Sequence, residues 1–334
     1  MASHPAHLEA SENIPDHRFL VVIGAAGESG YGENFSAMEK RWREIAQRAG
    51  AAYHAIGVGE LSGDRNDREA LKEYLGEVVE HEKETLWLVL LGHGTFDGVD
   101  AKYNLRGPDL TAGELAAWLD PKERDLIVIN TTSSSAPFLP LLAGPGRIIV
   151  TATKSAHEIF YTRFGEYFAA ALAAPVADID RDGQSSLLES FLTAARQVEE
   201  DYEERGLLAT EHAIIDDNGD GRGTRADRFR GVRAEKEAGE VLPDGLRAHQ
   251  VHLDPSREER LFAPDLRARR DALELEVAEW RYRKGELGAD AYYGALEKIF
   301  REIAAIYREA EARPTGKEPV LPVPTPFPGG GDDR

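Results

Sequence analysis

The chain contains no cysteine, which excludes disulfides, thiolate metal sites and a cysteine nucleophile. It also lacks any run of about 20 apolar residues, the length that spans a bilayer. Basic residues are in deficit, because 40 Lys and Arg face 60 Asp and Glu, for a net charge of −20. We therefore expect neither nucleic acid nor an anionic membrane as a partner, since both would repel this chain. Residues 1–16 are polar with no apolar core, unlike a signal peptide, so the protein is expected in the cytoplasm if Met1 is its natural start.

What is present is typical of a globular protein. The chain has 334 residues, 42% of them hydrophobic, which is enough for one large domain and an appendage. Short apolar runs at 19–23, 51–56, 86–91, 126–129 and 147–151 predict strands. Amphipathic stretches at 35–49, 67–80 and 111–119 lie between them, and further helices are predicted at 136–142, 160–172 and 186–205, with a short strand at 212–215. The fold class predicted is α/β: a three-layer, mostly parallel sheet with helices on both faces.

The composition divides the chain into five segments. We expect a disordered N-terminus at 1–17, the sheet domain at 18–234, a polar linker at 235–254, a helical hairpin at 255–313 and a disordered tail rich in Pro and Gly at 314–334. Apolar residues in the hairpin recur at the three- and four-residue spacing of coiled-coil seams. The simpler interpretation is a hairpin that packs on its own sheet domain. The alternative is an arm that pairs with a second copy to form a homo-oligomer.

Two strand ends carry the residues most suited to chemistry. The strand at 86–91 runs into Gly92-His93-Gly94, and the strand at 126–129 runs into a hydroxyl-rich segment that includes Thr132 and Ser133. If these strands are parallel neighbours, a histidine base and the hydroxyls meet at one edge of the sheet. That edge, beyond the carboxyl ends of the strands, is where open α/β sheets place their sites.

At these residues the chain resembles the caspase–legumain class of cysteine peptidases. In that class an apolar strand ends in His-Gly with the base, and the next core strand ends in a short turn with the nucleophilic cysteine. His93 matches the base, whereas the cysteine position falls on Thr132 and the family's glycine on Ser135. The resemblance covers residues 18–222 and implies a caspase-like fold, a hydrolase ancestry and a peptide or protein partner.

The replacement of the cysteine leaves two functions open. A hydroxyl is a weak nucleophile and needs a well-placed general base, usually a histidine oriented by a third group. An active peptidase would use Thr132 or Ser133 with His93 as base, but the sequence offers no third group. We favour a non-catalytic member, a pseudopeptidase. A structural alternative is that the hydroxyl run caps the helix at 136–142.

Two acidic loops fit the calcium loop of the EF-hand, which supplies oxygen ligands at fixed positions and a glycine at position six. In the first loop, at 178–189, the ligand positions hold Asp178, Asp180, Asp182, Gln184 and Glu189. In the second, at 216–227, they hold Asp216, Asn218, Asp220 and Asp227. We predict calcium for the first loop, although Pro175 interrupts the helix that would enter it. For the second loop, calcium and a solvated acidic turn stay open.

A glycine-rich loop gives a third functional class. Gly24 to Gly30 follows the first strand and Glu60 follows the second, a pattern shared with nucleotide-binding α/β proteins. Such a loop alone is weak evidence, so the alternative interpretation is a loop at the functional edge of the sheet.

Overall fold

The computed structural model describes residues 17–60, 66–78, 84–119, 125–174, 177–235, 242–260, 262–286 and 288–312. The ends predicted to be disordered, 1–17 and 314–334, lie outside these residues, except for His17. Pro175 also lies outside them.

A seven-stranded sheet forms the centre of the molecule, in the order β10-β9-β8-β7-β3-β1-β2. Five neighbouring strands, β8, β7, β3, β1 and β2, pair in parallel. The other two, β9 and β10, are antiparallel and lie at one edge. The mostly parallel α/β sheet predicted from the sequence is confirmed. The strands are β1 (His17–Ile23), β2 (Ala52–Ile56), β3 (Thr85–Leu91), β7 (Leu126–Asn130), β8 (Arg147–Thr151), β9 (Ile214–Asp216) and β10 (Thr224–Arg225).

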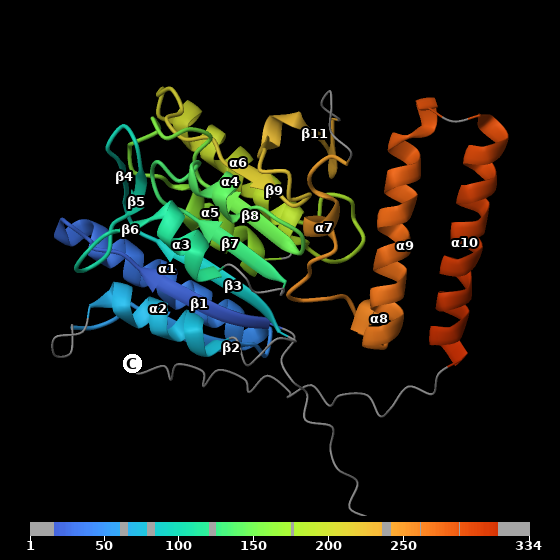
Figure 1. Ribbon diagram of the computed structural model, residues 1–334, viewed down its shortest axis with the longest axis horizontal. Helices are drawn as coiled ribbons and strands as arrows, with labels where there is room; N and C mark the ends of the chain where they lie inside the picture. Colours follow the sequence, from blue (N-terminus) through green and yellow to red (C-terminus); the bar gives the residue numbers. More distant parts are fainter. Residues whose placement is uncertain are drawn as a thin grey trace, which may run out of the picture.

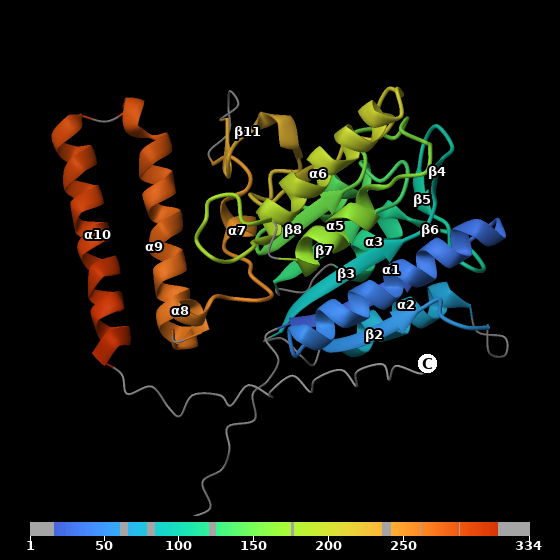
Figure 2. The ribbon, with the colours of Figure 1, turned by 180° about the vertical axis from the view of Figure 1, so that it is seen from behind.

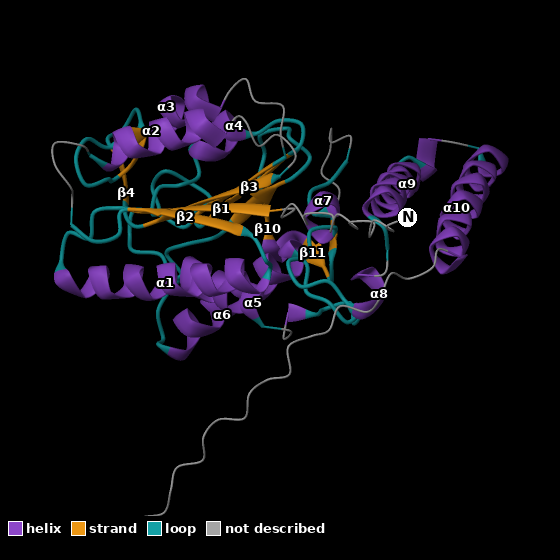
Figure 3. Ribbon diagram, turned by 90° about the horizontal axis from the view of Figure 1, so that it is seen from below, coloured by secondary structure: helices purple, strands orange, loops and turns teal. Residues whose placement is uncertain are grey.

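Helices cover both faces of this sheet (Figure 3). On one face lie α1 (Ser29–Arg48), α5 (Phe164–Ala173) and α6 (Leu187–Glu204), and on the other α2 (Asp67–Glu77), α3 (Ala112–Leu119) and α4 (Phe138–Leu142). Alternate residues of a strand point to opposite faces of the sheet. Because helices cover both faces, the strands are apolar at successive positions. In β3, Trp87 and Val89 join the core under α1 and α5, while Leu88 and Leu90 join the core under α2 and α3.

Three small features differ from the prediction. A three-stranded sheet that was not predicted is formed by β4 (Gly94–Phe96), β5 (Ala101–Tyr103) and β6 (Leu110–Thr111). Helix α5 begins at Phe164 rather than at 160, because the backbone N–H of Arg163 and of Phe164 donates to the carboxylate of Glu211. A second small pair, β11 (Phe229–Arg230) with β12 (Arg233–Ala234), was not predicted either.

The segment predicted as a linker is packed against the domain where the structure describes it. It contains α7 (Leu246–His249), whose Ala248 is fully buried in the core under α6. The chain then continues through α8 (Arg257–Arg260) to the hairpin of α9 (Pro264–Tyr282) and α10 (Ala289–Ala312). In both Figure 1 and Figure 2, α9 lies between α7 and α10, and α10 is outermost. Among the residues described, no helix combines the length and the apolar character needed to cross a membrane.

Candidate functional site

Strands β3 and β7 are parallel neighbours, with Leu90 in register with Asn130. Their ends therefore meet at one rim of the sheet, as the sequence predicted. The contact is close, because the Gly94 N–H donates to Ser133 Oγ (3.2 Å) and Ser133 Oγ donates to the Gly94 carbonyl (2.9 Å). A Cβ at Gly94 would lie 2.1 Å from the Ser133 carbonyl oxygen. Only glycine fits after His93 at this rim.

The imidazole of His93 lies among aromatic rings. The ring of Tyr31 meets it edge-on with centroids 4.7 Å apart, Phe35 lies at 5.3 Å and Tyr161 at 6.1 Å. In the part of the chain that the structure describes, no hydrogen bond joins this ring to Thr132 or Ser133. Tyr31 and Phe35 belong to α1 and Tyr161 to the loop before α5, so these two segments surround the histidine that follows β3.

The hydroxyl of Thr132 is engaged within its own turn. Thr132 is fully buried, and its Oγ1 donates to Asn130 Oδ1 at 2.8 Å, while its backbone N–H donates to the same oxygen at 3.1 Å. Ser133, 4% exposed, is engaged with Gly94 as described above. Both predicted hydroxyls therefore belong to an internal hydrogen-bond network.

None of these hydroxyls caps the following helix. Helix α4 begins after Pro137, which has no side-chain cap, and the Phe138 N–H donates to the backbone carbonyl of Ser135. The Ser135 hydroxyl pairs instead with Thr153 Oγ1 at 3.1 Å. The capping interpretation of the hydroxyl run is wrong, because the loop turns back onto β8 before the helix starts.

Two residues of this turn were not singled out from the sequence. Ser134 has a left-handed backbone with φ of 51°, is 1% exposed, and its Oγ lacks a hydrogen-bond partner among the described residues. Asn130 is fully buried and accepts two hydrogen bonds, but its Nδ2 is likewise unpaired there. A non-glycine residue at positive φ is a strained conformation that clusters at functional sites. In the sequence, only the run of small polar residues could have pointed to this strained turn.

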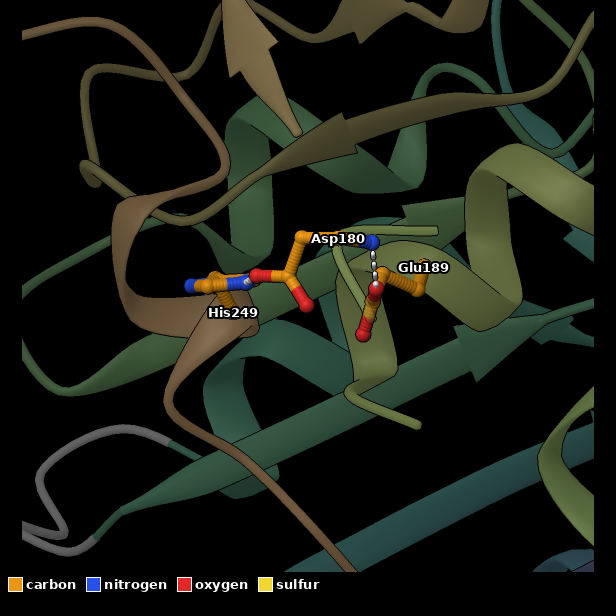
Figure 4. A group of neighbouring side chains, drawn as sticks. All are labelled: Asp180, Glu189 and His249. Carbon is orange, nitrogen blue, oxygen red and sulfur yellow. Dashed lines mark hydrogen bonds and ion pairs between the residues drawn. The ribbon is translucent and has the colours of Figure 1, made fainter. Parts of the chain in front are cut away.

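The first acidic loop brings three of its predicted ligand carboxylates together. Oxygen atoms of Asp178, Asp180 and Asp182 lie within 4.8 Å of one another, and a second group joins Asp180 to Glu189 and His249. Figure 4 shows Asp180 between His249, whose Nε2 is 3.0 Å from Asp180 Oδ2, and Glu189. The carboxylate of Glu189 accepts from the N–H of Ile179 and from Ser186, and so caps α6.

The two loops share one backbone pattern. Positions four and six have positive φ in both, at Arg181 (65°) and Gly183 (88°) and at Gly219 (79°) and Gly221 (78°). In both loops, the backbone N–H of position six donates to the carboxylate of position one. The N–H of position five donates to the side-chain oxygen of position three, and the N–H of position seven donates to the carboxylate of position five. The resemblance between the loops seen in the sequence therefore extends to their conformation.

The second loop has a neighbour that the sequence did not reveal. Asp244, 1% exposed, accepts from the backbone N–H of Asp217 and Asn218 and from the Thr224 hydroxyl (2.6 Å). Burial raises the pKa of Asp244 to about 8, and burial raises that of Asp216 to about 6. Asp227, in contrast, pairs with Arg225 at 2.8 Å. No local pattern in the sequence links Asp244 to a loop more than twenty residues earlier.

The glycine-rich loop is tied to the edge of the sheet where it leaves β1. The N–H groups of Gly24 and Ala25 already donate to the carbonyls of Leu91 and Asn104. Helix α1 has the acidic Glu28 at its N-cap, where a nucleotide phosphate would need to lie. The structure thus favours the alternative stated for this segment, a loop packed at the edge of the sheet.

No protein-family model matches the chain, and no curated protein matches it. Among solved structures it is similar to the Drosophila initiator caspase Dronc, with 14% identity and a TM-score of 0.40 over 63% of this chain and 82% of that one. It is also similar to caspase-1 from Spodoptera frugiperda, with 12% identity and a TM-score of 0.38 over 64% of this chain and 94% of that one. A Geobacter sulfurreducens protein follows, at 13% identity and a TM-score of 0.37 over 60% and 92%.

Proposed function

We propose that the protein is a non-catalytic relative of the caspase–legumain peptidases, which binds calcium through its acidic loops and recognises a peptide or protein segment beside His93. The proposal that the protein is non-catalytic rests on Thr132, whose side chain is fully buried and hydrogen-bonded to Asn130. A hydroxyl nucleophile needs a base within about 2.6–3.2 Å and access to the substrate carbonyl. Thr132 has neither, and Ser133 Oγ donates to a backbone carbonyl.

A hydrolysis assay tests this part. Purified protein is incubated with a diverse peptide library, with and without calcium, beside the variant His93→Ala. We expect no cleavage by either protein, because no described hydroxyl is placed to give its proton to His93. Cleavage by the natural chain that is lost in His93→Ala would instead establish the alternative, a peptidase that uses Thr132 or Ser133.

Exposed apolar residues support a peptide-binding role for the rim. Ile159 is 60% exposed and Phe160 is 63% exposed, directly before the Tyr161 that contacts the His93 ring. Peptides selected from a display library on the natural protein should lose binding in Phe160→Ser and keep it in Val99→Ser, a matched change at a site 85% exposed in the loop between β4 and β5. Equal binding by both variants would place the peptide elsewhere.

The donor set of the loops fits calcium. Ligand oxygens of one calcium lie about 2.3–2.6 Å from it, and hence within roughly 5 Å of one another. The carboxylates of Asp178, Asp180 and Asp182 meet this requirement, and calcium would replace their mutual repulsion with attraction. Asp216, Asn218 and Asp220 would serve in the second loop, with Asp244 next to them.

Thermal unfolding after chelation tests the calcium site. Calcium at about 100 times its Kd should stabilise the protein by about 2.7 kcal/mol, which raises the melting temperature. Asp180→Asn should remove the part of this shift that the first loop contributes, while Asp109→Asn, an exposed acid outside both loops, should leave the shift unchanged. An unchanged melting temperature on adding calcium to the natural chain would rule out the metal.

A further inference from the structure

Strand β2 forms one edge of the central sheet (Figure 1), and in the described part of the chain no further strand pairs with its outer side. An open edge presents unpaired backbone N–H and C=O groups, which proteins usually protect with very short strands, charges or proline. The opposite edge follows this rule, because β10 has only two residues. Strand β2 has five residues and contains no Asp, Glu, Lys, Arg or Pro. It is therefore able to accept a further strand.

A groove of about 390 Å³ runs along this edge, between β2 and α2. On the strand side, the consecutive residues His54, Ala55 and Ile56 all line it. Because successive side chains of a strand point to opposite faces, a pocket on one face of the sheet would be lined by alternate residues only. The groove therefore follows the edge of the strand. On the other side, residues of α2 and its N-cap share one helix face: Asn66, Asp67, Ala70, Glu73, Tyr74 and Glu77.

The groove is acidic. Among the described residues that line it, four carboxylates, those of Glu60, Asp67, Glu73 and Glu77, stand against the guanidinium of Arg106, which leaves a net charge of −3. That guanidinium is already engaged, since its Nε lies 2.6 Å from Asp67 Oδ2. A groove lined by charges of one sign attracts ligands of the opposite sign and repels those of its own sign.

The histidine in the groove does not offset this charge. The ring of His54 stacks on the ring of Tyr74 with centroids 4.2 Å apart and planes 7° from parallel, so it joins the strand to the helix. Burial lowers the pKa of His54, and the ring is therefore uncharged at neutral pH. The groove thus combines an open strand edge, an aromatic pair and a surplus of carboxylates.

We propose that this groove binds an extended peptide segment with Lys or Arg at alternate positions, which adds an eighth strand beside β2. Backbone hydrogen bonds to the open edge supply affinity in this mode of recognition, and the side chains at alternate positions supply specificity. Alternate residues of the added strand face α2, where Glu77 attracts their basic groups. A second copy of this chain fits less well, because its own groove carries the same negative charge.

A synthetic peptide of alternating lysine and valine tests the proposal. Its control is the same peptide with N-methyl groups on two consecutive central residues, which keeps the charge but blocks hydrogen bonding on both edges of the strand. By titration calorimetry, the unmodified peptide should bind about tenfold more tightly than the control, and it should slow amide exchange in residues 52–56. Absence of binding, equal affinity of the two peptides, or unchanged exchange in β2 would overturn the proposal.

Paired variants of the protein test the charges. Glu60→Gln with Glu77→Gln removes two carboxylates of the groove and should weaken binding of the unmodified peptide about fivefold at low ionic strength. Glu44→Gln with Glu204→Gln removes two exposed carboxylates of α1 and α6, which cover the other face of the sheet, and should leave the affinity unchanged. An equal loss in both double variants would show that the peptide senses only the overall charge of −20, which contradicts a site at β2.

Discussion

Asn130 determines what Thr132 can do. Its side-chain oxygen accepts from both the backbone N–H and the hydroxyl of Thr132, so the hydroxyl is engaged within its own turn at the end of β7. The sequence correctly predicted that His93 and Thr132 share a rim, because two apolar runs of strand length lead into them. The direction of the hydroxyl could not be predicted, because it depends on a single side-chain rotamer. In the residues described, the hydroxyls of Thr132 and Ser133 are both buried and hydrogen-bonded within the protein.

Gly94 is the residue at which the two strand ends press together most closely. Gly94→Ala would place its Cβ 2.1 Å from the Ser133 carbonyl oxygen and 2.8 Å from Thr132 Oγ1, and both belong to the packed loop. We expect a loss of about 1–3 kcal/mol in the free energy of unfolding, the range for overpacking. Gly113→Ala in α3, with no neighbouring atom within 4 Å, should not destabilise the protein. Chemical denaturation measures both, and equal stability of the two variants would show that the contact is loose.

Elements with a strong local signal were predicted well. Strands β3 and β8 are continuous apolar runs, and α6 is preceded by a capping box in which Ser186 and Glu189 bond reciprocally. Thr111 and Glu114 bond reciprocally in the same way at the start of α3, since the Glu114 N–H donates to Thr111 Oγ1 and the Thr111 N–H donates to the Glu114 carboxylate.

Elements that depend on distant contacts were missed. The strands β4, β5 and β10 have only two or three residues each, too short for a periodic pattern. The predicted linker is polar in sequence, yet it docks because the Asp217 carboxylate accepts from the N–H groups of Gly245 and Ala248. A bond between segments more than twenty residues apart leaves no trace in a local window. The same reason hid Asp244 from the sequence analysis.

The whole molecule carries a charge of −20, and part of that charge is buried. Three buried carboxylates lie at the second acidic loop. Asp216 and Asp217 begin the loop, Asp244 accepts from the Asp217 N–H, and each of the three is at most 1% exposed. Burial is the largest cause that raises the pKa of each of them. Ionising all three without a cation places like charges in a region of low dielectric constant, which destabilises the fold.

This cluster predicts a pH dependence of stability that calcium should reduce. The pKa of Asp244 rises from 3.8 unfolded to about 8 folded, so its stabilising contribution is complete below about 4 and is lost as the pH rises toward 8. We expect the chelated protein to lose on the order of 4 kcal/mol between about pH 5 and pH 8 from this cluster. Asp244→Asn should flatten this part of the curve relative to Asp109→Asn, and calcium should stabilise the natural chain more at the higher pH. Parallel curves for the two variants would exclude Asp244 as the cause.

Thiol labelling shows whether reagents reach position 132 in the folded protein, and it is possible because the chain contains no natural cysteine. In Thr132→Cys the single thiol replaces a side chain that is fully buried, whereas in Val99→Cys it replaces one that is 85% exposed. The rate of alkylation of each thiol is measured under native conditions and again in denaturant, where both should react equally. We expect the thiol at position 132 to be strongly protected in the native protein. Labelling at position 132 as fast as at position 99 in the folded state would contradict it.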